Sequence, residues 1–158
     1  MSIIIDKEFQ SLIPPLSDDE FRQLEENCIR DGIRDPLVTW PQDDGTEILI
    51  DGHNRWKISA KNAGIPFKIV QMRFESRDAA KAWIIKNQLG RRNVALYARY
   101  ELMKIIEPEE KAKAKERQGT RTDIVPNLAR SEPGKTRDKM AAMLGVSHGT
   151  YDKLKFID

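Results

Sequence analysis

The feature that most constrains this chain is the stretch Ile48–Lys57, where an apolar run meets a glycine and a group of polar side chains. Residues 48–50 predict a buried strand, and Gly52 allows a sharp turn where a Cβ atom would clash. The helix that follows begins with N–H groups that have no partner within the helix, which suits an anion such as phosphate. The polar residues of the turn are therefore candidate ligand contacts: Asp51, His53, Asn54 and Arg55. The alternative is an ordinary strand-to-helix turn with solvated polar residues.

Composition describes a globular chain with a charge-rich surface. Of the 158 residues, 39% are hydrophobic and 33% are charged, which is enough for one core or for one domain and a smaller part. The apolar runs are too short to span a membrane, and the N-terminus lacks the basic region of a secretory signal. The single cysteine, Cys28, excludes an internal disulfide and a cysteine-rich zinc site, and its place on an apolar helix stripe predicts a core residue. These features predict a cytoplasmic protein.

Charge is distributed unevenly along the chain. Residues 1–85 hold 11 Lys/Arg and 15 Asp/Glu, whereas residues 86–158 hold 16 and 10. A basic C-terminal half favours a polyanionic partner, although charge of one sign is also a common property of protein surfaces.

Strand and helix signals alternate over residues 1–93 and predict a small α/β or α+β domain. The segment up to Leu16 is expected to be extended, and Ser17 with Glu20 predicts a capping box at the start of a helix. Strands are expected at 33–40 and 47–51, as a hairpin, and at 66–74. Helices are expected at 54–62 and from Ser76 to Leu89. Residues 94–117 predict connecting helices that Pro108 breaks, kinks or divides, and the Gly- and Pro-containing residues 118–135 predict a flexible linker.

Residues 136–158 fit a helix-turn-helix. Gly145 occupies the turn, Ala141 is the small residue where two helices must approach closely, and Ser147 caps the second helix. The apolar positions that pack the two helices together are Met140, Leu144, Val146, Tyr151 and Leu154. The alternative is any short helical hairpin. Because such a pair needs a third helix to cover its apolar face, we expect the chain to be shortened or to be the front part of a longer protein.

Candidate DNA contacts follow from the helix-turn-helix interpretation. The first turn of the second helix would face base edges in the major groove, and nearby basic side chains would meet phosphates. The candidates are Arg137, Lys139, Ser147, His148, Thr150, Lys153 and Lys155. Double-stranded DNA is therefore the expected partner, and a homodimer is expected because one such unit reads too few base pairs.

A second polar cluster occupies residues 86–93, Lys-Asn-Gln-Leu-Gly-Arg-Arg-Asn. Adjacent arginines beside amide side chains predict a clamp for phosphate or carboxylate, whereas the alternative is a charged helix C-terminus. No metal site is expected, because the two histidines lie in different predicted domains.

The two polar clusters, in this order and ahead of a helix-turn-helix, resemble the N-terminal domain of ParB-type partition proteins and the sulfiredoxin-like fold. Gly32–Val38 resembles that family's G-x-x-x-P strand entry, Gly52–Lys57 its G-E-R-R-x-R turn, and Lys86–Gln88 with Arg91 and Arg92 its E-N-x-Q-R motif. The resemblance implies an α/β (α+β) domain with a small mixed sheet, followed by an all-α helix-turn-helix region. It also implies a site for a nucleotide, CTP or ATP, formed by Gly52, His53, Asn54, Arg55, Asn87, Arg91 and Arg92.

Departures from the family pattern argue against catalysis. His53, Asn54 and Lys86 replace Glu, Arg and Glu, and a lysine at position 86 would repel magnesium. Sulfiredoxins place their catalytic Cys at position 53, so peroxiredoxin repair is excluded. We therefore expect a DNA-binding ParB-like protein of a plasmid, phage or mobile element, acting in partition, replication or transcription control. The alternatives are an NTPase or phosphotransferase resembling free-serine kinases of this fold, whose turn reads Asp-Gly-His-His-Arg, and a protein-interaction module.

Overall fold

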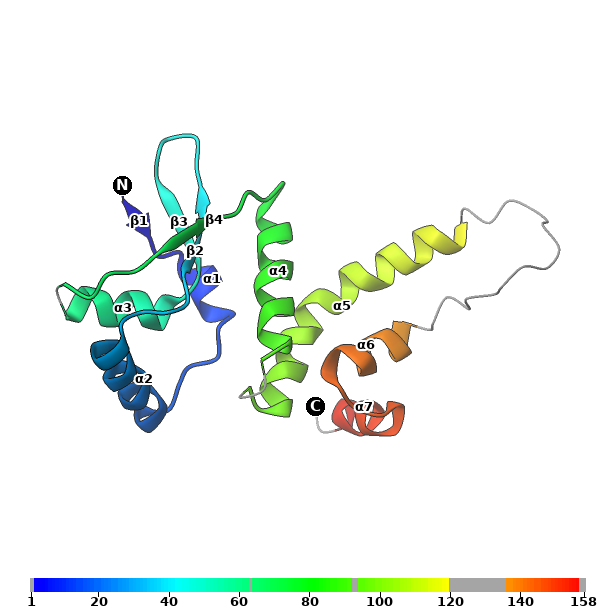
Figure 1. Cartoon of the computed structure of the whole chain (residues 1–158). Coiled ribbons are helices and arrows are strands. Elements are labelled where there is room, and N and C mark those ends of the chain that lie inside the picture. Colours follow the sequence, from blue (N-terminus) through cyan, green and yellow to red (C-terminus); the bar gives the residue numbers. More distant parts are fainter. Residues whose placement is uncertain (1, 63, 92–93, 120–135, 157–158) are drawn as a thin grey trace, which may run out of the picture. The chain divides into compact units, whose positions relative to one another are not determined.

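The chain forms two compact units, Met1–Ile84 and Ile85–Asp158. The computed structural model describes residues 2–62, 64–91, 94–119 and 136–156 (Figure 1). The boundary between the units lies within helix α4 (Arg77–Leu89), whereas the sequence pattern placed the end of the first domain at residue 93. None of the described helices is both long and apolar enough to cross a membrane.

A mixed four-stranded sheet forms the centre of the first unit. The strands are β1 (Ile3–Ile4), β2 (Leu37–Pro41), β3 (Glu47–Asp51) and β4 (Ile69–Gln71), in the order β1-β3-β2-β4. The predicted hairpin is present, since β2 and β3 pair antiparallel, while β1 pairs with β3 and β4 with β2 in parallel. The third predicted strand is only three residues long, because its pairing to β2 covers Leu37 to Thr39 alone. This sheet and its helices confirm the predicted fold class.

Helices α2 (Asp18–Asp31) and α3 (His53–Lys61) lie side by side in the first unit (Figure 1). The predicted capping box is confirmed: the Ser17 side chain accepts from Glu20 N, and the Glu20 side chain accepts from Ser17 N at 2.8 Å. Cys28 is buried with Ile33 and Ile58 in the core between these helices, as predicted. Because Gly52 and the start of α3 follow β3 directly, this packing fixes where the polar turn lies.

The segment before Leu16 is not simply extended, and that prediction was wrong. Helix α1 (Lys7–Ser11) begins where the Asp6 side chain accepts from the backbone N–H groups of Glu8 and Phe9. Phe9 is fully buried and lies 6.5 Å from the Trp40 ring, so tertiary packing stabilises a helix of only five residues.

In the part of the second unit that the structure describes, the end of α4 is followed by three helices. Helix α5 (Leu96–Gly119) runs through Pro108 without interruption, although the sequence predicted a break, a kink or a second helix there. Its buried side chains on both sides of Pro108, Ile106 and Glu110, belong to the same packed face, and this packing outweighs the lost backbone hydrogen bond. Residues 118 and 119 of the predicted linker lie in α5, and the rest of the linker lies outside the described residues.

Helices α6 (Thr136–Leu144) and α7 (His148–Lys155) are joined by a short turn at Gly145, whose φ is 69°. Gly145 N donates to Ala142 O and Val146 N to Ala141 O, both at 3.0 Å, which is the Schellman arrangement of a helix end. Ser147 caps α7 by accepting from Thr150 N at 3.2 Å. The helix that covers this pair is α5, which precedes it in the sequence, rather than one that follows.

Candidate functional site

The Gly52 turn is shaped by close contacts on both sides of the glycine. Gly52 has φ 96°, in the left-handed region that favours glycine, and it occupies the N-cap position of α3. A Cβ atom there would lie 2.6 Å from Leu37 Cδ2 and 3.1 Å from Arg55 Nη2. Among the described residues no side chain caps α3, so its first N–H groups have no capping partner there. The sharp glycine turn is thus present, while anion binding at it stays a prediction.

Arg55 connects the turn to the loop before β2. Its Nη2 donates to Asp51 Oδ2 at 3.2 Å and to the Pro36 carbonyl at 3.3 Å, and its Nη1 lies 3.5 Å from Asp35 Oδ2. The Nε atom is buried and has no hydrogen-bond partner among the described residues. Arg55 therefore stabilises the turn, and its buried Nε–H is a donor that these contacts leave unused.

His53, the first residue of α3, is a buried imidazole at the same turn. Only 6% of it is exposed, and within the described parts of the chain neither ring nitrogen has a hydrogen-bond partner. Burial lowers the pKa of His53, and the nearby Asp51 carboxylate only partly offsets this effect. The ring is therefore neutral at pH 7, with one donor and one acceptor available. Asn54 follows it, half-buried in the first turn of α3.

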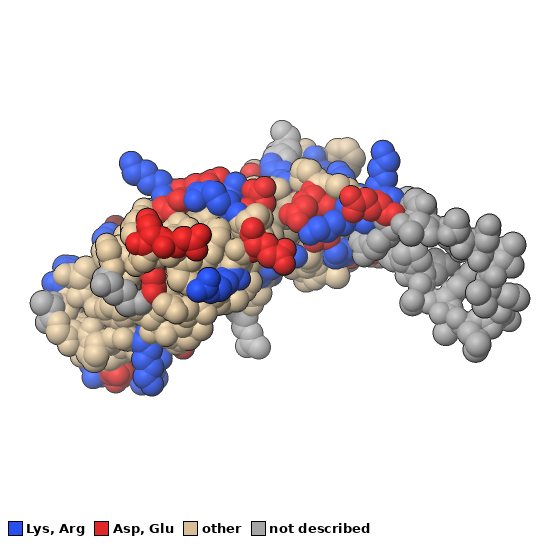
Figure 2. Space-filling view, turned by 90° about the horizontal axis from the view of Figure 1, so that it is seen from above, with Lys and Arg blue, Asp and Glu red and all other residues tan. Residues whose placement is uncertain are grey.

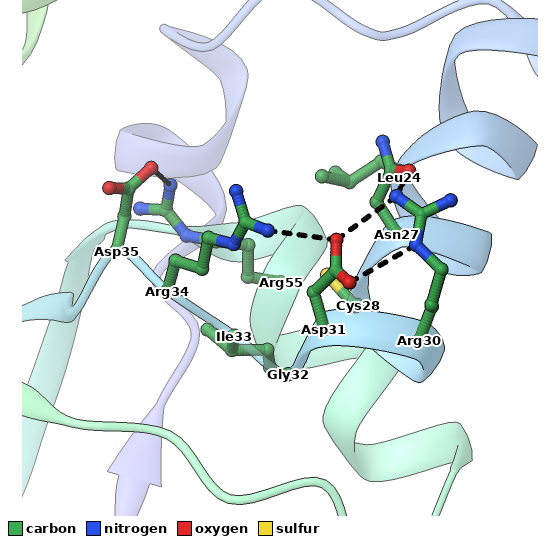
Figure 3. A pocket seen from close by; sticks show the side chains of 10 residues that line it. All are labelled: Leu24, Asn27, Cys28, Arg30, Asp31, Gly32, Ile33, Arg34, Asp35 and Arg55. Atoms are coloured by element: carbon green, nitrogen blue, oxygen red, sulfur yellow. Dashed lines mark hydrogen bonds and ion pairs between the residues drawn. The ribbon is translucent and has the colours of Figure 1, made fainter.

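An open pocket of about 310 Å³ adjoins Arg55 (Figure 3). Asp31 lies between Arg30 and Arg34, with an oxygen 3.0 Å from a guanidinium nitrogen of each, and Arg34 is largely exposed. The pocket brings together the end of α2, the loop that leads to β2 and the first turn of α3; its lining residues are Leu24, Asn27, Cys28, Arg30, Asp31, Gly32, Ile33, Arg34, Asp35 and Arg55. Sequence reasoning missed Arg30 and Arg34 as site residues, although both lie within two positions of Gly32.

The second predicted cluster belongs to the other compact unit. Asn87 is half-buried in the last turn of α4, and Arg91 follows the helix, with its N–H donating to Gln88 O at 3.0 Å. Arg92 lies outside the described residues. Lys86 lies 3.5 Å from the Glu110 carboxylate. A single ligand site shared by this cluster and the Gly52 turn stays a prediction.

Two of the predicted phosphate contacts pair with carboxylates of α5. Lys139 donates to Glu110 Oε2, and Lys155 lies 3.8 Å from Glu107 Oε1 and over the Tyr151 ring. Glu110 is 4% exposed, so its ion pairs are largely shielded from water. Both lysines thus have intramolecular partners.

Other predicted DNA contacts cluster where α6 meets the start of α7. His148 Nε2 lies 3.3 Å from Asp138 Oδ1, and Arg137 lies 3.6 Å from Asp152 Oδ2. Ser147 and Thr150 are engaged in the α7 cap, with their hydroxyl oxygens 3.0 Å apart. Lys153 is exposed, and no ion pair links it to another described residue.

Acidic and basic side chains are interspersed on the face of the molecule that Figure 2 shows. On that face, binding of a polyanion would therefore depend on individual positions rather than on one uniform surface. Over the described ranges, no group of three or more His, Cys, Asp or Glu side chains could hold a metal ion.

Comparison with solved structures identifies the fold. The pNOB8-like ParB N-domain matches over 97% of this chain and 60% of its own, with a TM-score of 0.63 and 22% identity. ParB from Caulobacter crescentus, C-terminally truncated and complexed to the centromeric parS site, matches over 96% of this chain and 65% of its own, with a TM-score of 0.57 and 12% identity. The chain has a ParB-like fold. It spans about 60–65% of these two chains. No protein-family model and no curated protein matches the sequence.

Within the ParB-like fold, two of the residues that depart from the family pattern have different surroundings. His53 is buried and neutral, and Lys86 faces the Glu110 carboxylate of α5. The ParB-like fold is therefore retained here with different polar chemistry at two of the motif positions.

Proposed function

We propose that this chain is a site-specific, ParB-like DNA-binding protein that acts on duplex DNA in partition, replication control or transcription of a plasmid or other mobile element. The observation that carries the proposal is the α6–α7 hairpin. Its Schellman turn ends α6 and its Ser147 cap begins α7, with His148 and Gly149 exposed at the α7 N-terminus. A helix N-terminus presented in this way suits entry into the major groove.

Three side chains near the α7 N-terminus are the proposed contacts to DNA. His148 and Thr150 lie in the first turn, where side chains reach base edges, and the exposed Lys153 lies one turn further on, where a cation meets phosphate. Arg137 and Ser147 are proposed to contact the sugar–phosphate backbone beside them. The fold shared with a ParB solved on parS supports this assignment.

A homodimer in the cytoplasm completes the proposal. One hairpin covers only a few base pairs, and dimers of such units read two half-sites about one helical turn apart. The binding site is accordingly expected to be a palindrome or a near-palindrome.

Binding to a random-sequence duplex is expected to weaken by about 10- to 100-fold between 50 and 200 mM salt, because a few phosphate contacts release counterions. Lys153→Ala should weaken binding at all sequences and lower the slope of log K against log salt by about 1. Fluorescence anisotropy with a labelled duplex measures both quantities.

Lys68→Ala is the matched control for Lys153→Ala. Lys68 is exposed, and its substitution removes the same charge as Lys153→Ala. It belongs to the first unit, away from α7 in the chain. Equal losses in the two variants would indicate a general charge effect and would count against the α7 assignment. Binding that does not change with salt would contradict the proposed function itself.

A second candidate function is nucleotide binding at the Gly52 turn. It is favoured by a pocket that three guanidinium groups line, among them that of Arg55. Within the described residues, the Nε of Arg55 and both ring nitrogens of His53, two positions earlier in the chain, have no hydrogen-bond partner. Such groups suit the phosphates of CTP or ATP. Turnover of the nucleotide would make the chain a small NTPase or phosphotransferase, and a requirement for magnesium would distinguish that activity from simple binding.

One of CTP, ATP and GTP, tested with and without magnesium, is expected to stabilise the first unit, by about 2.7 kcal/mol at 100 times its Kd. Arg34→Ala should abolish most of this stabilisation, because Arg34 lines the pocket and its side chain is 75% exposed, so the fold does not depend on it. Thermal unfolding followed by tryptophan fluorescence is the measurement. Arg22→Ala, on α2 but outside the pocket, should behave as wild type. No shift with any nucleotide would reject this candidate.

A further inference from the structure

Two carboxylates of α5 receive contacts from both helices of the hairpin. Glu107 and Glu110 are three residues apart, on either side of Pro108. Glu110 accepts from Lys139 of α6 and lies 3.5 Å from Lys86 of α4. Glu107 accepts from the Tyr151 hydroxyl of α7 at 3.1 Å and lies 3.8 Å from Lys155. Each helix of the hairpin is thus linked to α5 by a charged contact.

Breaking these contacts would cost free energy, because the carboxylates are shielded from water. Only 5% of the Glu110 side chain and 16% of the Glu107 side chain is exposed. The hydrogen bond from Lys139 keeps the pKa of Glu110 below its ordinary value despite burial. Burial raises the pKa of Glu107, but Lys111, Tyr151 and Lys155 together lower it further. A lysine that moved to a phosphate would leave a buried carboxylate with one partner fewer.

We propose that Glu107 and Glu110 are positioning residues, which fix the α6–α7 hairpin on α5 in the orientation that presents the α7 N-terminus to DNA. Lys139 and Lys155 serve this docking rather than contacting phosphate. The inference rests on the proposed DNA-binding function. It gives a role in that function to two residues that do not themselves contact DNA.

The sign of the expected effect separates positioning from electrostatics. Removing a negative charge from a DNA-binding unit strengthens binding when charge alone matters, because repulsion of the phosphates falls. If Glu110 positions the hairpin, the same substitution weakens binding. The two explanations therefore predict opposite changes in affinity.

Glu110→Gln in the full chain is the first variant to test. We expect its affinity for the labelled duplex to fall at least about tenfold, and amide hydrogen exchange across residues 136–156 to become faster. Glu109→Gln is the matched control, since Glu109 lies next to it on α5, is 44% exposed and pairs only with Lys113 of the same helix among the described residues. The control should bind DNA at least as tightly as wild type, with unchanged exchange.

Lys139 provides a second variant in case Glu110→Gln disturbs the fold. Lys139→Met should lower affinity without changing the slope of log K against log salt, whereas loss of a phosphate contact lowers that slope by about 1. Lys139→Arg should bind DNA about as tightly as wild type, because arginine keeps the ion pair with Glu110. A reduced slope in Lys139→Met, or binding by Glu110→Gln as tight as wild type, overturns the positioning role.

The outcomes also separate this role from the proposed function. If the wild-type chain binds no duplex, the proposed function fails, and the positioning role fails with it. Normal DNA binding by wild type together with unchanged hydrogen exchange and affinity in Glu110→Gln rejects the positioning role alone.

Discussion

Gly52→Ala is expected to destabilise the first unit by about 2–5 kcal/mol. The left-handed backbone costs a residue with a side chain about 1–2 kcal/mol. The new methyl group would lie 2.6 Å from Leu37 Cδ2, in a core where overpacking costs about 1–3 kcal/mol more. The chain's three tryptophans, Trp40, Trp56 and Trp83, all belong to this unit, so denaturant unfolding followed by tryptophan fluorescence measures its stability directly.

Gly45→Ala separates the two causes. Gly45 has φ 81°, but a Cβ atom there would meet nothing within 4 Å. This variant should lose only the conformational part, about 1–2 kcal/mol. Equal losses at the two positions would show that Leu37 moves aside easily, and would argue against a tightly packed turn.

Local signals explain why much of the first unit could be predicted. The apolar run before Gly52, the Ser17–Glu20 capping box and the turn between β2 and β3 each arise from residues close in sequence. Such short-range chemistry can be read without knowing the fold. Helix α1 could not be predicted with the same ease, because five residues form a helix there only while Phe9 is buried against the rest of the unit.

Pro108 shows the limit of local rules in the second unit. A proline within a helix removes one backbone hydrogen bond, which justified an expected interruption. Tertiary contacts of α5 on both sides of that residue keep one helix instead. Those contacts come from α6 and α7, more than 25 residues later in the chain, so the local sequence does not contain them.

The candidate sites likewise consist of features that the local sequence predicts and features that only the folded structure shows. Gly52 and Arg55 could be found from their spacing, because the turn and the helix start are local features. The partners of Lys139 and Lys155 could not, since a basic side chain near a capped helix fits phosphate and a distant carboxylate equally well. The pocket beside Arg55 likewise needs the fold, because it joins α2, the loop before β2 and α3.

Tyr151→Ala is expected to destabilise the second unit by about 3–5 kcal/mol, the usual loss for a buried aromatic ring. Tyr151 is fully buried, its ring lies 6.4 Å from that of Tyr100, and its hydroxyl donates to Glu107. Tyr151→Phe should lose only the hydrogen bond to the carboxylate, about 1.5–3 kcal/mol. Tyr97→Ala, at a position 49% exposed, should cost less than about 1 kcal/mol.

Two probes on the same sample make this prediction specific to the hairpin. Far-UV circular dichroism reports the helices of both units, whereas tryptophan fluorescence reports only the first. Tyr151→Ala should therefore shift the helical signal to lower denaturant and leave the fluorescence transition in place. If both signals shifted together, the two units would unfold as one, and Tyr151 would stabilise the whole chain. If neither shifted, the contact between α7 and α5 would contribute little, and the positioning role of Glu107 would lose its physical basis.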